Sequence, residues 1–238
     1  MILFVKLFLV HLLVDFVFQT DQWVKDKELK KHKSPKLYLH VLLHGLLSMA
    51  IVWEINFWPY ALGIAISHLF IDWCKLTFQT NNNQKIWFGV DQISHVAILL
   101  LVTVMCKQQE IDYSAFALYQ ESVWTILAAV VFLSFPTSVL IRILISGWTP
   151  KTEDKPKESL ENAGKYIGVL ERLFVLTFIL TDHWEGIGFL LAAKSIFRFG
   201  DLKESKERKL TEYVMIGTLL SFGLALLTGL LVLMSITS

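Results

Sequence analysis

The chain has 238 residues, of which 54% are hydrophobic and only 18% are charged, and its mean hydropathy is +0.53. A soluble domain carries closer to a quarter charged residues, so this balance favours an integral membrane protein. The net charge of +1 and the excess of apolar residues exclude a disordered chain and a nucleic-acid-binding surface. Cys74 and Cys106 are the two cysteines, too few for a disulfide framework or a thiolate zinc site.

Apolar runs of nearly the length of a membrane span recur along the chain. A helix needs about 20 mostly apolar residues to cross the hydrocarbon core. Eight stretches approach this length, which predicts an all-α, polytopic membrane protein. In chain order they are Ile2 to Gln19, Leu37 to Trp58, Pro59 to Phe78, Asp91 to Cys106, Ser122 to Trp148, Lys165 to Asp182, Trp184 to Phe199 and Thr211 to Ile236. Pro136 predicts a kink in the fifth stretch, because proline has no N–H and crowds the carbonyl one turn earlier.

Basic residues gather in alternate connections between these stretches. Seventeen of the 22 Lys and Arg lie in four segments: 20–36, 75–85, 151–165 and 198–209. By the positive-inside rule these segments are cytoplasmic, and both termini lie outside. The polar segment that follows the fourth stretch predicts a division into two four-helix halves. The first half, 1–108, is rich in His and Asp, and the second, 109–238, carries a cluster of basic and acidic residues.

Histidines in the first four stretches are paired at helical spacing. Five of the seven histidines lie in predicted spans, and each has a His or Asp four positions away. The pairs are His11 with Asp15, His40 with His44, His68 with Asp72, and Asp91 with His95. Residues four apart share one face of a helix, whereas chance would give about one histidine such a neighbour. With alternating orientation, all four pairs fall in the cytoplasmic half of the membrane, which predicts one ring of imidazoles and carboxylates.

Imidazole and carboxylate together are ligands for divalent transition metals, with zinc favoured and manganese, iron or nickel as alternatives. All eight paired residues are therefore candidate metal ligands, for one ion or two. A bound ion can lower the pKa of coordinated water toward neutrality, and Asp15, Asp72 and Asp91 are candidates for a catalytic base. Two other interpretations stay open, a proton or ion pathway and a structural network of hydrogen bonds between helices.

Three runs in the first half resemble a known family. They are His11 to Gln19, His68 to Lys75 and Asp91 to His95, and they look like the domain of unknown function 3307, a family of bacterial membrane proteins without an established activity. In the second half, Gly164 to Arg172 and Ala193 to Phe199 are similar to longer members. The resemblance implies a multi-pass protein of the bacterial inner (plasma) membrane and gives no reaction.

Charged residues also recur in the later stretches. They are Arg142, Glu171, Arg172, Lys194, Arg198 and Glu212. Lys194 and Arg198 are four apart and would repel one another unless an anion lay beside them, with Glu171 and Glu212 as candidate partners. We expect Arg172, Lys194 and Arg198 to bind an anionic substrate, such as a lipid phosphate. The alternative is a salt-bridge network whose long basic side chains reach toward the headgroups.

These features together predict a membrane-embedded, metal-dependent hydrolase that acts from the cytoplasmic side on an ester or phosphoester. Lipid-linked esters and phosphoesters are among the possible substrates. The expected partners are membrane lipids and an anionic or lipid-phosphate substrate, without nucleic acid. An ion- or proton-coupled transporter that uses the same ring is the main alternative. A non-catalytic membrane scaffold, which would bind a cytosolic partner through the basic loops, is the other.

Overall fold

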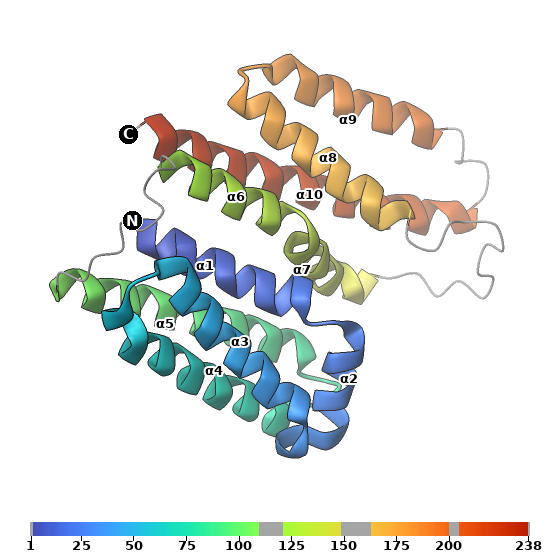
Figure 1. The fold of residues 1–238 in the computed structure, drawn as a ribbon. Helices are drawn as coiled ribbons and strands as arrows, with labels where there is room; N and C mark the ends of the chain where they lie inside the picture. The colour runs from blue at the N-terminus through green and yellow to red at the C-terminus, as the bar shows by residue number, and fades with distance from the viewer. Residues whose placement is uncertain (1, 110–120, 149–162, 200–204, 238) are drawn as a thin grey trace. The chain divides into compact units, whose positions relative to one another are not determined.

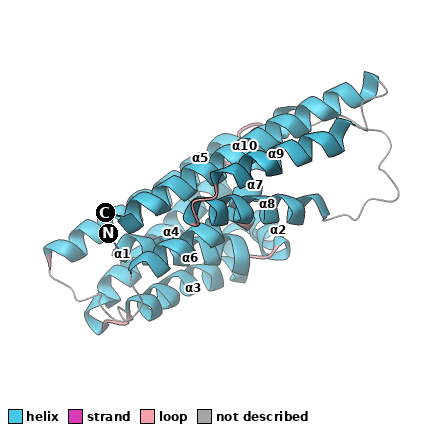
Figure 2. Ribbon diagram, turned by 90° about the horizontal axis from the view of Figure 1, so that it is seen from above, coloured by secondary structure: helices cyan, strands magenta, loops and turns pink. Residues whose placement is uncertain are grey.

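The structure, a computed structural model, describes residues 2–109, 121–148, 163–199 and 205–237. Within these residues the chain forms helices and turns and has no strand (Figures 1 and 2). This confirms the predicted all-α fold for the described part of the chain. The chain divides into two compact units, Met1–Ala128 and Ala129–Ser238, and each is described by itself.

Several helices are long and apolar enough to cross a membrane. Four segments meet this test alone: Pro35–Val52, Ile55–Phe78, Gln84–Gln108 and Thr211–Thr237. Two bent pairs meet it when each pair is taken together: Ile2–Phe18 with Asp21–Lys33, and Glu121–Leu133 with Phe135–Trp148. The described residues therefore hold four to six candidate spans. The sixth and seventh predicted stretches form α8 (Ala163–Leu180) and α9 (Trp184–Phe199), which are not among them.

Four helices of the first unit form a bundle. They are α1 (Ile2–Leu13), α3 (Pro35–Val52), α4 (Trp58–Phe78) and α5 (Gln84–Gln108). Contacts join α1 to α3, α3 to α4, α4 to α5, and α5 back to α1, so the four helices enclose a common interior. Faces that carry the paired His and Asp residues can therefore meet inside the bundle.

Local backbone geometry fixes where these helices begin and end. Pro35 and Pro59 occupy first turns, where a helix has no use for their missing N–H. The predicted second stretch is wrong at its end, because Trp53 is left-handed, with φ of 56°, and terminates α3 at Val52. A 3₁₀ turn, Ile55–Phe57, follows, and Trp58 already belongs to α4.

A polar helix, α2 (Asp21–Lys30), forms within the first basic connection and continues into a 3₁₀ turn, Lys31–Lys33. This helical segment lies at 87° to the helix before it. Lys30 Nζ lies 2.5 Å from Asp26 Oδ1, and Ser34 Oγ donates a 2.5 Å hydrogen bond to Asp26 Oδ2. These bonds, that of Lys30 first, lower the pKa of Asp26, and the Ser34 bond secures the end of the turn to α2.

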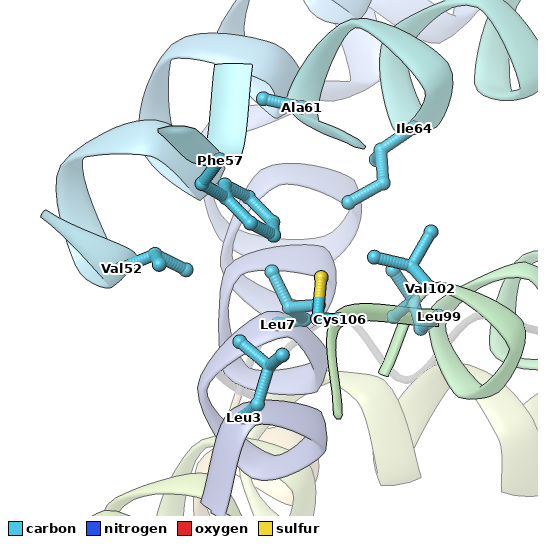
Figure 3. Packing of buried hydrophobic residues seen from close by; sticks show 9 residues of the cluster. All are labelled: Leu3, Leu7, Val52, Phe57, Ala61, Ile64, Leu99, Val102 and Cys106. Carbon is cyan, nitrogen blue, oxygen red and sulfur yellow. The ribbon is translucent and has the colours of Figure 1, made fainter. Parts of the chain in front are cut away.

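Apolar side chains fill one end of the bundle. The cluster consists of Leu3, Leu7, Val52, Phe57, Ala61, Ile64, Leu99, Val102 and Cys106, and Figure 3 shows these side chains directed into one space between the helices. Leu7 lies one turn before His11, Ile64 one turn before His68, and Leu99 one turn after His95. The cluster therefore packs directly against the polar interior, on the side toward the predicted outer ends of the helices.

The second unit is built around α10 (Ser205–Thr237), which packs against α7 (Phe135–Ile145) and α8. Helix α6 (Glu121–Leu133) is followed at once by α7, and the bend of 41° between them agrees with the kink expected from Pro136. Thr137 Oγ1 donates a 2.6 Å hydrogen bond to the Phe132 carbonyl, which the missing N–H of Pro136 leaves free.

Candidate metal centre

The eight predicted ligands come together inside the first unit and are called the His/Asp ring below. They are His11 on α1, Asp15 on a π-helical turn (η1, Val14–Phe18), His40 and His44 on α3, His68 and Asp72 on α4, and Asp91 and His95 on α5. Seven of them are buried, and the Asp15 side chain is 10% exposed. The helical spacing therefore predicted which side chains share the bundle interior.

One group of four ligands centres on Asp15. Ligand atoms of His11, Asp15, His44 and His68 all lie within 4.8 Å of one another. His44 Nε2 is 2.8 Å and His68 Nε2 3.7 Å from Asp15 Oδ1, while His11 Nδ1 is 3.8 Å from Asp15 Oδ2. Asp15 lies in a π-helical turn, a feature frequent at functional sites. Three imidazoles and one carboxylate match a four-coordinate zinc site in number and type.

His40 connects this group to the next helix. Its Nε2 lies 3.0 Å from His68 Nε2, 3.4 Å from Asp15 Oδ1 and 3.9 Å from Asp72 Oδ2. Two imidazole nitrogens at 3.0 Å need one proton between them, or a shared cation. His40, His68 and Asp72 accordingly form a second group whose ligand atoms lie within 4.8 Å.

The third group consists of Asp72, Asp91 and His95, again with ligand atoms within 4.8 Å. His95 Nε2 is 3.5 Å from Asp91 Oδ1 and 3.9 Å from Asp72 Oδ1. This group shares no residue with the four-ligand group of Asp15. The ring therefore offers two independent sets of ligands.

Two lysines that the sequence indicated only as topology signals contact carboxylates of the ring. Lys27 Nζ from α2 lies 2.8 Å from Asp72 Oδ2, and Lys75 Nζ lies 2.8 Å from Asp91 Oδ2. Lys75 lies one turn after Asp72 on the same helix, and this spacing could have indicated its position near the ring. No spacing in the sequence relates Lys27 to the ring residues. Within the described residues the ion-pair partners of Asp15 are histidines, so it carries the carboxylate charge that these two lysines leave uncompensated.

Amide side chains complete the polar surroundings. Gln92 Oε1 is 3.3 Å from His11 Nε2, and Gln92 Nε2 donates a 3.1 Å hydrogen bond to Asp91 Oδ2. Lys27 Nζ also donates to Gln19 Oε1 at 3.2 Å. Gln92 thus bridges His11 of the four-ligand group and Asp91 of the three-ligand group. Gln19 instead contacts Lys27 of α2.

A small cavity adjoins the imidazoles. Its volume is about 10 Å³, and its polar lining consists of His11, His44, His68, His95, Ser48 and Ser67. That volume is close to the minimum that holds one water molecule. Its apolar lining is Leu7, Ile64, Ile98 and Leu99, so the cavity lies between four imidazoles of the ring and the apolar cluster and has room for about one water.

Arg172, predicted to bind substrate, lies at the break between α6 and α7. It is 3% exposed, and its guanidinium donates to the carbonyls of Leu133 and Ser134 at 2.6 and 3.0 Å. It also donates to Ser138 Oγ at 2.6 Å and Ser221 Oγ at 3.1 Å. These acceptors are helix-end carbonyls and hydroxyls, so the contacts give Arg172 a structural role at the kink.

Lys194 has the internal partner expected from the sequence. Its Nζ donates a 2.6 Å hydrogen bond to Glu171 Oε2 and lies 5.9 Å from the centre of the Phe222 ring. The side chain of Arg198 falls outside the described residues. Anion binding by Lys194 and Arg198 stays a prediction.

Comparison with known proteins gives one family. The family model described as "Protein of unknown function (DUF3307)" matches residues 3–126, more than half of the chain and all eight ring residues. No curated protein and no solved structure matches the chain. The resemblance seen in the sequence is confirmed: the chain belongs to the DUF3307 family.

Proposed function

We propose that this protein is a membrane-embedded hydrolase that depends on a divalent transition metal, with zinc as the favoured ion. The observation that carries the proposal is the convergence of five imidazoles and three carboxylates from four helices into one buried ring. Isolated polar residues in membrane helices are often hydrogen-bond partners, but eight ligand-type side chains at one depth are an expensive way to join helices.

The charge balance of the ring supports a cation. Asp72 and Asp91 have lysine partners, while Asp15 faces imidazoles. A divalent ion among His11, Asp15, His44 and His68 would neutralise Asp15. The ion proposed first therefore binds at this four-ligand group.

The proposed topology follows the basic residues. Eight spans, in halves 1–108 and 109–238 with both termini outside, would place α2 and the ring on the cytoplasmic side of a bacterial inner membrane. The lysines of α2 would then lie at the anionic headgroups. A lipid-linked ester or phosphoester could approach the ring from that surface.

The proposed reaction is hydrolysis. A water oxygen bonds to the carbonyl carbon or phosphorus of the substrate, the ester C–O or P–O bond breaks, and the alcohol leaves with a proton. One of Asp15, Asp72 and Asp91 would accept the proton of the attacking water. Arg172 is left out of the proposed substrate site because its described contacts are at the helix break.

A proton- or ion-coupled transporter is the second candidate, since imidazole and carboxylate atoms follow one another at 2.8–3.9 Å across the bundle. Transport requires a path to both faces, whereas the apolar cluster of Leu7, Ile64 and Leu99 packs against one side of the ring. This asymmetry favours an enzyme open to one side. Ion flux into liposomes that is abolished by His68→Ala would favour the transporter instead.

Elemental analysis of purified protein without an affinity tag tests the proposal. Wild type should hold at least one equivalent of transition metal, and a His68→Ala, Asp72→Ala double variant should lose it. His32→Ala is the matched control, because His32 is exposed and lies outside the ring. Wild type that holds no metal, even after incubation with zinc, would contradict the proposal.

A further inference from the structure

Asp72 and Asp91 each divide their two oxygens between a lysine and the ring interior. Lys27 binds Oδ2 of Asp72, and Lys75 binds Oδ2 of Asp91. The Oδ1 atoms of both carboxylates lie on the side of His95, at 3.9 and 3.5 Å from its Nε2. The lysines thus bind the Oδ2 atoms, of which that of Asp72 also lies 3.9 Å from His40 Nε2, and leave the Oδ1 atoms available.

One of these Oδ1 atoms and the His95 nitrogen that faces it lack a hydrogen-bond partner within the described residues. Asp91 Oδ1 and His95 Nε2 are buried and have no hydrogen-bond partner among the residues that the structure describes. Asp91 is only 2% exposed and His95 4%. An unsatisfied buried carboxylate oxygen costs free energy, so such atoms usually mark a water or an ion.

The arrangement around them matches the surroundings of a metal ligand. Carboxylates that bind metal are themselves hydrogen-bonded on their outer side, which fixes the direction of the ligating oxygen. Here Lys27 and Lys75 supply those outer bonds, and Gln92 adds another to Asp91 Oδ2. Three protein ligands leave coordination positions open, as in catalytic zinc sites, whereas four ligands close a site.

We propose that Asp72, Asp91 and His95 bind a second divalent cation, and that its open coordination positions take water and an anionic oxygen of the substrate. This inference deepens the proposed function and rests on it: the four-ligand group of Asp15 holds the first ion, and the three-ligand group is where the substrate's phosphate or carboxyl oxygen binds. The second ion, through its open positions, would stabilise the charge that develops on the attacked group, while the first ion neutralises Asp15. Lys27 and Lys75 are positioning residues for the second ion.

Equilibrium dialysis against zinc or cobalt tests the number of sites. Wild type should bind two equivalents, Asp91→Asn one and His11→Ala one, since each variant removes a ligand of a different group. His32→Ala should still bind two. One equivalent in wild type that Asp91→Asn leaves unchanged would overturn the second site while the proposed function stands. Wild type that binds none would refute both.

The cobalt spectrum tests the open coordination without a variant that might fail to fold. Inorganic phosphate added to the cobalt-loaded wild type should change the absorption bands of one ion, because phosphate enters an open position. Asp91→Asn should lose this response and keep the spectrum of the other ion. A wild-type spectrum that phosphate leaves unchanged would show that both sites are closed and would overturn the inference.

Discussion

Lys27 and Asp72 form a buried ion pair, 2.8 Å from Nζ to Oδ2, between the polar helix α2 and the interior of the bundle. Their side chains are 7% and 8% exposed. The contact secures α2 to α4 and neutralises one of the three ring carboxylates. It connects the segment that carries most of the basic residues of the first unit to the candidate metal centre.

Loss of Lys27 should therefore be costly. Lys27→Met leaves the Asp72 carboxylate buried without its ammonium partner, a change that destabilises proteins by about 3–5 kcal/mol. We expect a clearly lower midpoint of thermal unfolding in detergent without metal, and a partial recovery when zinc is added. Lys30→Met is the control on the same helix, because the Lys30 side chain is 57% exposed, and it should change the midpoint little. Equal midpoints for the two variants would contradict a structural role for the Lys27 pair.

Lys75 should act on metal affinity through Asp91. Loss of a residue that orients a ligand typically weakens metal binding about 10–100-fold. Lys75→Met should weaken the binding of the second equivalent of zinc by that factor and leave the affinity for the first equivalent unchanged. Lys75→Arg should restore most of the affinity for the second. Isothermal titration of the metal-free protein measures both. A loss of the first equivalent, or no rescue by arginine, would show that Lys75 does not work through Asp91.

The ring was predictable from sequence because its members repeat at the helical period. His68 with Asp72 and Asp91 with His95 lie on shared helix faces, and alternating helix direction brought the pairs to one depth. The lysines were not predictable in the same way. Lys27 reaches Asp72 across 45 positions of the chain, and helix α2 stands where the sequence indicated only a basic connection. Contacts of this kind depend on the direction in which a polar helix such as α2 leaves the bundle. The periodicity of the sequence does not indicate that direction.

The kink in the second unit shows the same limit. Pro136 predicted the bend itself, since the missing N–H is a property of one residue. Which group would satisfy the carbonyls at the break depended on the packing of α8 against α7. Arg172, interpreted from sequence as a substrate ligand, contacts those carbonyls. An arginine in an apolar helix has several interpretations until its neighbours are known.

Two glycines of α10 should respond in opposite ways to alanine. A Cβ on Gly229 would overlap Cδ1 of the buried Ile179 and come within 3.4 Å of its Cβ, whereas a Cβ on Gly223 would meet nothing within 4 Å. Gly223→Ala should raise stability by up to about 1 kcal/mol through helix propensity. Gly229→Ala should lower the free energy of unfolding by about 1–3 kcal/mol through overpacking, and the gain in helix propensity offsets only part of this loss. Thermal unfolding of both variants in one detergent checks the difference, and a more stable Gly229→Ala would contradict the close packing of α8 and α10.

Arg172 should prove structural. Arg172→Met removes the side-chain donor of the Leu133 carbonyl, whereas the Ser134 carbonyl keeps a 2.9 Å hydrogen bond from Ser138 Oγ. An unsatisfied buried carbonyl costs about 1–3 kcal/mol. Arg172→Lys should recover only part of this, because a single ammonium cannot reproduce the fixed geometry of the guanidinium donors. Unfolding in detergent measures the loss, and Thr177→Val on the exposed side of α8 is the control. If Arg172→Met kept wild-type stability but lost phosphate binding to the cobalt-loaded protein, the anion-binding role expected from the sequence would stand instead.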